Sequence, residues 1–255
     1  MRNTFAIAGK ELRSYFASPI AYIVIGLFVL LYGVFYWLYL QSFLREALNL
    51  GQYGTQQALN INQHMLRPIV QNVTVLLLFV LPAMTMRAYA EERRSGTIEL
   101  LLTSPITDLE IVVGKFLGAL GLYVVMLSVT LIHIAILFWY GDPEWKPIAT
   151  MYLGLVLLGG SFLSIGLFIS TLTTNQIVAY IGSFSLFLLM WIVSWFGSFT
   201  TGFWTDLTSY LSIIEHLDDF NKGVIDTTHV IYYLSLITFG LFLTAKSVDT
   251  ERWRG

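Results

Sequence analysis

The fold is decided by one stretch, IVVGKFLGALGLYVVMLSVTLIHIAILF, which fills residues 111–138. A lysine near its start and a histidine near its end are its only basic residues, and it contains no carboxylate. About 20 apolar residues in an α-helix are enough to cross the hydrocarbon core of a bilayer. The stretch therefore predicts a helix that spans a membrane.

Five further stretches have the same character. The six predicted spans are Ile20–Leu40, Ile69–Met86, Ile111–Phe138, Ala149–Leu172, Ile177–Phe196 and His229–Lys246. Lipid offers no partner to an open sheet edge, so we expect every span to be helical. The 255 residues are 56% hydrophobic and 12% charged, whereas soluble domains carry about 25% charged residues. The sequence predicts an all-α membrane protein with six transmembrane helices.

The positions of Lys and Arg predict the orientation of the spans. Ten of the 14 lie near the two ends of the chain or between the second and third spans, and four lie in the other connections. Connections rich in Lys and Arg stay in the cytoplasm. Both termini and residues 91–115 are therefore expected to be cytoplasmic. A net charge of -2 gives no indication of a nucleic-acid partner.

Residues 4–17 predict an amphipathic helix that precedes the first span. Its apolar face would consist of Phe5, Ala8, Leu12 and Phe16, with Lys10 and Arg13 lying off that face. Ser18-Pro19 would end this helix and turn the chain into the membrane. We interpret it as an elbow helix along the inner surface; a simple N-terminal anchor is the alternative.

Two outer segments are expected on the opposite side. Residues 41–68, rich in Gln and Asn, predict a solvated loop. Residues 197–228 predict an outer loop with a short helix, begun by the capping box Ser212–Glu215 and ended by Gly223. The apolar face of this short helix would include Ile213, Leu217 and Phe220. The helix either covers lipid or forms a lid over an exit path.

Residues 91–115 read EERRSGTIELLLTSPITDLEIVVGK. The second span is expected to continue as a helix to Ser95-Gly96. A short helix over 98–103 would follow, and the capping box Thr107–Glu110 would start the third span. The charged residues expected to be exposed beside leucines 100–102 are Glu91, Glu92, Arg93, Arg94 and Glu99. Mixed charge around apolar residues suits docking to another protein; a solvated loop with a local packing cluster is the alternative.

Several kinds of chemistry lack the residues they need. The chain contains no G-x-x-x-x-G-K, the P-loop that binds ATP. His64, His133, His216 and His229 have no second ligand at helical spacing, so we expect no metal site. His133 lies inside a span, where either a functional role or a hydrogen bond to a neighbouring helix would explain it. An ion-driven transporter needs carboxylates near the midplane, and an intramembrane enzyme needs a base beside its serines; neither is favoured.

These features resemble the permease subunits of ABC transporters of the type-2, exporter-like family. The resemblance rests on EERRSGTIELLLTSPIT from Glu91, followed by Ile111 and Lys115. Three other stretches are similar to the family's elbow, its turn between the fourth and fifth spans, and the segment before its last span: KELRSYFASP (10–19), LFISTLTTNQ (167–176) and HLDDFNKGVIDT (216–227). The likeness is greatest to six-span permeases of the gliding-motility type.

The resemblance implies a single permease domain over residues 1–255, in a bacterial inner membrane. It implies a second permease copy, identical or related, and an ATP-binding subunit that holds ATP and Mg, so that this chain binds no cofactor and is not an enzyme. The loop 91–110 would couple the two subunits. Its contact residues would be Glu91, Glu92, Arg93, Arg94, Gly96, Thr97, Glu99, Leu100 and Pro105, and the elbow would carry Lys10, Glu11 and Arg13.

The function that follows is the membrane subunit of an ATP-driven exporter. The alternative is a subunit that transports nothing and uses ATP to act on a periplasmic or membrane accessory protein.

Overall fold

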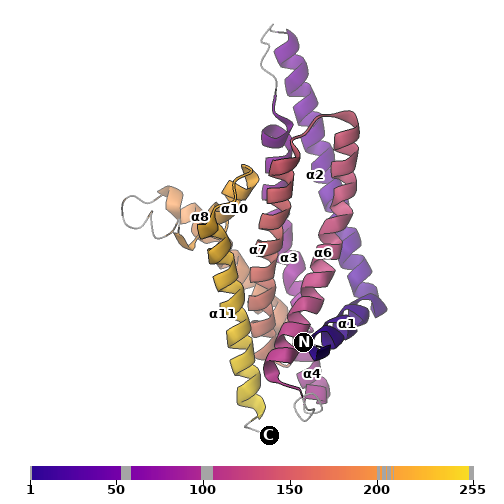
Figure 1. The fold of residues 1–255 in the computed structure, drawn as a ribbon, viewed down its shortest axis with the longest axis vertical. Helices are drawn as coiled ribbons and strands as arrows, with labels where there is room; N and C mark the ends of the chain where they lie inside the picture. Colours follow the sequence, from indigo (N-terminus) through magenta and orange to yellow (C-terminus); the bar gives the residue numbers. More distant parts are fainter. Residues whose placement is uncertain are drawn as a thin grey trace.

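The computed structural model describes residues 2–52, 59–98, 106–199 and 210–252, together with the single positions 202, 205 and 208. All regular structure in these residues is helical (Figure 1). The helices are α1 (Arg2–Ala17), α2 (Pro19–Gln52), the π-helical turn η1 (Asn62–Leu66), α3 (Arg67–Thr85), α4 (Ala90–Ser95), α6 (Asp108–Tyr140), α7 (Trp145–Thr171), α8 (Gln176–Phe199), α10 (Glu215–Asn221) and α11 (Thr227–Arg252).

The six predicted spans are confirmed as six helices long and apolar enough to cross a membrane. They are α2, α3, α6, α7, α8 and α11, and most boundaries lie within a few residues of those expected. Both termini lie at the same end of the molecule as α4 (Figure 1). An even number of spans requires this arrangement.

The first span differs most from its prediction, because α2 continues to Gln52. Residues 41–52 are therefore helical, and the expected outer loop over 41–68 is wrong for this part. The sequence QSFLREALNL contains strong helix formers and neither Gly nor Pro. The polar residues of this segment end the apolar stretch, but they do not terminate the helix.

The core lies around α7. In the most apolar 18-residue segment of α7, 67% of the residues are buried, whereas 17% are buried in the corresponding segment of each of α2, α8 and α11. In Figure 1, α7 stands in the middle of the bundle, with α11 on one side and α6 and α2 on the other. On α2, α8 and α11, large apolar side chains such as Trp37, Ile181 and Phe239 are exposed. In water such faces would be costly, but in lipid they are in their preferred solvent.

The predicted helix before the first span is confirmed as α1. It crosses the start of α6 where glycines permit close approach: a Cβ on Gly114 would lie 2.7 Å from Ile7 Cβ, and one on Gly118 would lie 2.7 Å from Glu11 Cβ. The small residues in this part of α6 therefore provide the contact surface for α1.

Two prolines lie in α3. Pro68 lies in its first turn, where a missing N–H costs little. Pro82 lies in its last turn, and α3 ends at Thr85. The second span does not run on as one helix, because residues 86–89 form a turn before α4 begins. Gly96, with φ 72°, ends α4 in the left-handed conformation.

His133 packs against two aromatic rings. Its ring centroid lies 5.2 Å from that of Tyr32 and 5.1 Å from that of Tyr36, both on α2. Its Nδ1 has no hydrogen-bond partner within the described residues. The expected hydrogen bond between helices is not observed at this nitrogen.

Candidate functional site

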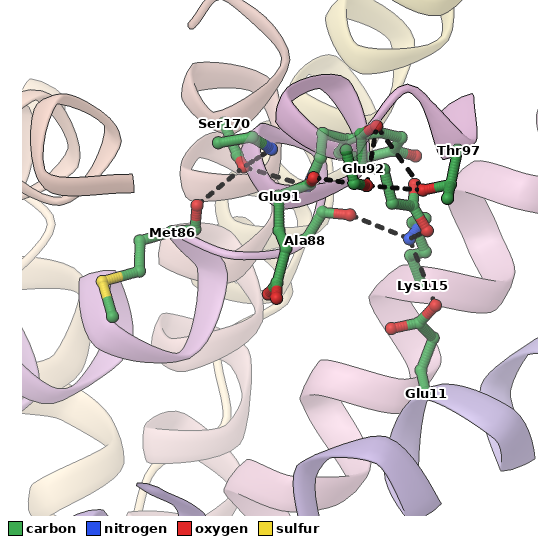
Figure 2. A network of polar contacts seen from close by, with 11 residues as sticks. Glu11, Met86, Ala88, Glu91, Glu92, Thr97, Lys115 and Ser170 are labelled. Atoms are coloured by element: carbon green, nitrogen blue, oxygen red, sulfur yellow. Dashed lines mark hydrogen bonds and ion pairs between the residues drawn. The ribbon is translucent and has the colours of Figure 1, made fainter. Parts of the chain in front are cut away.

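One hydroxyl group from α7 forms hydrogen bonds to the backbone of the turn between α3 and α4. Ser170 Oγ accepts hydrogen bonds from the backbone N–H groups of Tyr89 and Ala90, each at 3.1 Å, and donates to the carbonyl of Met86 at 3.2 Å (Figure 2). A helix start leaves its first N–H groups without partners in the helix itself. Ser170 supplies this missing partner, so the start of α4 is attached to α7.

Lys115 is the centre of a buried ion network. Its Nζ donates to Glu11 Oε1 at 3.1 Å, to Glu92 Oε1 at 2.7 Å and to the carbonyl of Ala88 at 2.8 Å (Figure 2). The Lys115 side chain is 2% exposed, while those of Glu11 and Glu92 are 15% and 20% exposed. Glu11 lies on α1, Glu92 on α4 and Lys115 on α6. One ammonium group therefore joins three helices.

A third connection joins α4 to the end of the chain. The Arg93 guanidinium forms an ion pair with Glu251 near the end of α11. On the other face, Arg87 Nε donates to Glu91 Oε2 at 2.8 Å, and this bond lowers the pKa of the Glu91 carboxyl. Through these contacts and those of Lys115 and Ser170, α4 is bonded directly to α6, α7 and α11, and Lys115 links it to α1.

A polar pocket lies beside this network. It has a volume of about 190 Å³ and is bounded by α1, the start of α2, the end of α3, and α4. The charged residues that line it are Lys10, Glu11, Arg87, Glu91, Glu92 and Lys115. Because positive and negative groups are equal in number and largely paired, the pocket can hydrate the network without favouring an ion of one sign.

The predicted coupling residues fall into three groups. Glu91, Glu92 and Arg93 are bonded within the chain; the expectation of exposure is wrong for Glu92 and Arg93, whose side chains are 20% and 19% exposed, whereas the Glu91 side chain is 47% exposed. Arg94, Gly96 and Thr97 are exposed at the end of α4. The remaining three, Glu99, Leu100 and Pro105, lie outside the described residues. The helix expected over 98–103 also falls mostly outside them.

The elbow residues divide similarly. Glu11 belongs to the Lys115 network, while Lys10 and Arg13 are exposed. Sequence reasoning used Lys115 in the charge count and in the family resemblance but did not predict its ion network. The available signal was a single lysine inside an apolar helix, directly after Gly114, since buried charges require partners.

At the other end of the molecule α10 packs into the bundle. The side chains expected to form its apolar face, Ile213, Leu217 and Phe220, are fully buried. A Cβ on Gly154 of α7 would lie 2.8 Å from Leu217 Cδ1, and Thr150 Oγ1 donates to the carbonyl of Phe220 at 2.7 Å. Ser212 Oγ accepts from the Glu215 N–H, and Gly223 ends the segment with φ 87°.

Two histidines that are distant in sequence meet beside α10. His216 Nδ1 lies 2.6 Å from His229 Nδ1, and His229 Nε2 lies 2.9 Å from Asp219 Oδ2. The turn between α10 and α11 brings together these two residues, which are 13 positions apart in the sequence. Nevertheless, the described part of the chain contains no group of three residues able to hold a metal ion.

Comparison with known proteins identifies the family. The sequence profile of the ABC-2 family transporter proteins matches residues 5–246. The chain is also 32% identical over 143 residues to the probable multidrug ABC transporter permease YbhR of Escherichia coli, in strain K12 and in O157:H7. That match covers 55% of this chain and 38% of each relative, so the chain spans well under half the length of the curated relatives it matches. The chain is a multi-pass membrane protein that belongs to the ABC-2 transporter family.

Proposed function

We propose that this chain is the membrane subunit of an ATP-driven exporter. In this proposal it lies in a bacterial inner membrane with both termini in the cytoplasm, pairs with a second permease copy, and docks an ATP-binding subunit through residues 91–110. The multidrug name of the related permease supports an export direction.

The observation that carries the proposal is the attachment of α4 to the bundle. A helix of six residues has little stability of its own, yet α4 is bonded directly to α6, α7 and α11 and is linked to α1 through Lys115. The exposed Arg94, Gly96 and Thr97 lie at its far end, next to the segment that holds Glu99, Leu100 and Pro105. Such an element can receive a displacement at one end and pass it to several spans.

The proposed mechanism is a shift between two arrangements of the permease pair. ATP closes the ATP-binding subunits, and their movement displaces residues 91–110. Glu92 and Arg93 then transmit this displacement to α1, α6 and α11 through Lys115 and Glu251. Nucleotide biases the equilibrium only if the subunits bind one arrangement more tightly than the other.

Reversing a charge in the docking segment tests the proposal. We expect Glu99→Lys to reduce recovery of the ATP-binding subunit in pull-down, or its stimulated ATPase activity, while membrane insertion is unchanged. The matched control is Glu46→Lys, which places the same charge change on the exposed outer part of α2. Normal complex recovery and normal ATPase stimulation in Glu99→Lys would contradict the docking role.

A second candidate function is mechanical transmission to an accessory protein, and α2 favours it. Its 34 residues span about 50 Å at 1.5 Å per residue, against a hydrocarbon core of about 30 Å. The outer end of α2 extends beyond the other helices in Figure 1 and exposes Leu44 and Leu48. Substituting both leucines by Gln would abolish co-purification of an outer partner if this function holds, and would leave export unaffected if it does not.

A further inference from the structure

A second pocket lies at the end of the bundle away from α4. It has a volume of about 470 Å³ and is enclosed by α3, α8 and α10, within the range of about 300–1,000 Å³ for small-molecule sites. Gln71 and Thr74 line it from α3, while Trp191, Ser194 and Trp195 line it from α8. The α10 side contributes Ile214, Glu215, Leu217, Asp218 and Asn221.

Two indole rings form one wall of this pocket. The ring centroids of Trp191 and Trp195 are 4.8 Å apart, with an angle of 56° between the ring planes. Both indoles line the pocket. Indole has the strongest attraction for cations among aromatic side chains, because its face carries the negative side of the ring quadrupole. This wall therefore suits a ligand that is both apolar and positively charged.

The pocket also contains acceptor oxygens for a ligand. The hydroxyl groups of Thr74 and Ser194 donate to carbonyls of their own helices, at 2.7 Å each, so they offer only lone pairs to a ligand. Asn221 is 5% exposed, and its Oδ1 has no hydrogen-bond partner within the described residues. A buried acceptor without a partner is costly, and a cationic ligand supplies the missing partner.

The charged residues that line the pocket also favour a cationic ligand. Glu215 is exposed and forms no ion pair with any described residue. Asp218 is paired, with Lys222 Nζ at 2.6 Å and Arg67 at 3.5 Å, but neither of these cations lines the pocket. The carboxylates of Glu215 and Asp218 therefore line the pocket, whereas the cations paired with Asp218 do not. An anion would be repelled by the Glu215 carboxylate.

We propose that the pocket between α3, α8 and α10 binds a lipophilic organic cation. Trp191 and Trp195 hold its apolar body, Glu215 balances its charge, and Asn221 Oδ1 accepts from it where it carries an N–H. This deepens the proposed export function and rests on it for the claim that the cation is cargo. The binding claim itself requires no nucleotide.

Tetraphenylphosphonium and tetraphenylborate are the probes, because they have nearly the same size and shape and opposite charge. Their binding is measured by equilibrium dialysis, without nucleotide, on the full chain with its partner subunits in lipid nanodiscs. We expect the cation to bind more tightly than the anion. Glu215→Gln should weaken cation binding about tenfold and Trp191→Leu about fivefold, whereas Trp191→Phe, which keeps an aromatic face, should lose less.

Glu46→Gln is the matched control, since it removes one exposed carboxylate from α2 and should leave cation binding unchanged. Equal loss in Glu46→Gln and Glu215→Gln, or equal binding of the two probes, would overturn the proposed site. Cation binding that depends on Glu215 but is never followed by ATP-driven movement would uphold the site and contradict export. ATP-driven export that is insensitive to Glu215→Gln would contradict the site alone.

Discussion

Replacing Lys115 by Met removes the charge at the centre of the ion network and keeps most of the side-chain volume. The change leaves Glu11 and Glu92 facing each other without the ammonium group that lies 3.1 Å and 2.7 Å from them. It also removes the donor to the Ala88 carbonyl at 2.8 Å. Removing one partner of a buried ion pair costs about 3–5 kcal/mol.

The expected cost lies at the lower end of that range. Glu11 and Glu92 retain 15% and 20% of their side-chain exposure, and both border the 190 Å³ pocket, where water can hydrate them. We therefore expect Lys115→Met to lower the free energy of unfolding by about 3 kcal/mol. Folded proteins are typically stable by only about 5–15 kcal/mol, so this loss is large.

The assay is SDS-induced unfolding in mixed micelles, followed by tryptophan fluorescence. Combining Lys115→Met with Glu11→Gln and Glu92→Gln removes all three charges and should recover most of the stability, because no uncompensated buried charge remains. Lys10→Met is the control: this lysine lines the same pocket but is exposed, and its effect should stay within about 0.5 kcal/mol. A loss below about 1 kcal/mol in Lys115→Met, or no recovery in the triple variant, would refute the reasoning.

Three further predictions concern the other contacts. Ser170→Ala leaves two N–H groups unpaired, which costs about 1–3 kcal/mol; hydrogen exchange at Tyr89 and Ala90 should become faster, and unchanged exchange would show that another group caps α4. Gly118→Leu introduces a side chain whose Cβ would lie 2.7 Å from Glu11 Cβ. Helix α1 should therefore detach from α6 and become sensitive to protease. Continued protection of α1 from protease would contradict the close contact. Burial lowers the pKa of His216 below its usual 6.5. The contact between α10 and α11 should therefore be complete above about pH 6.5 and weaken as the pH falls. The SDS concentration at the unfolding midpoint should drop between pH 7.5 and pH 5 in the parent and not in His216→Gln, and equal drops would exclude His216 as the cause.

Local patterns in the sequence predicted the elements that depend on neighbouring residues. Hydropathy located all six spans, because lipid requires about 20 apolar residues in each. The capping box at the start of α6 has both of its hydrogen bonds, between Thr107 and Glu110. The positions of Gly96 and Gly223 were also predicted, since both residues adopt positive φ at the end of a helix.

The contacts that build the candidate site could not be predicted in the same way. Lys115 meets Glu11 across 104 positions of the chain, and Ser170 meets Tyr89 across 81. No local pattern records such pairings, which depend on how α1, α4 and α7 pack. The sequence identified Glu91, Glu92 and Arg93 as charged residues of interest but could not show that they face their own chain. It likewise separated His216 from His229, which only the turn after Gly223 brings together.

The central claim is that α4 passes movement to the far end of the bundle through Lys115. The chain contains no cysteine, so spin labels can be attached at Glu46→Cys on α2 and Lys222→Cys beside α10, and their separation can be measured by electron–electron double resonance in the reconstituted complex. The account predicts that nucleotide shifts this separation in the labelled parent. The shift should become smaller in the variant carrying Lys115→Met, Glu11→Gln and Glu92→Gln, although the ATP-binding subunit remains bound, because the route through Lys115 is lost and the Arg93–Glu251 pair remains. An equal nucleotide-dependent shift in both proteins would contradict the claim.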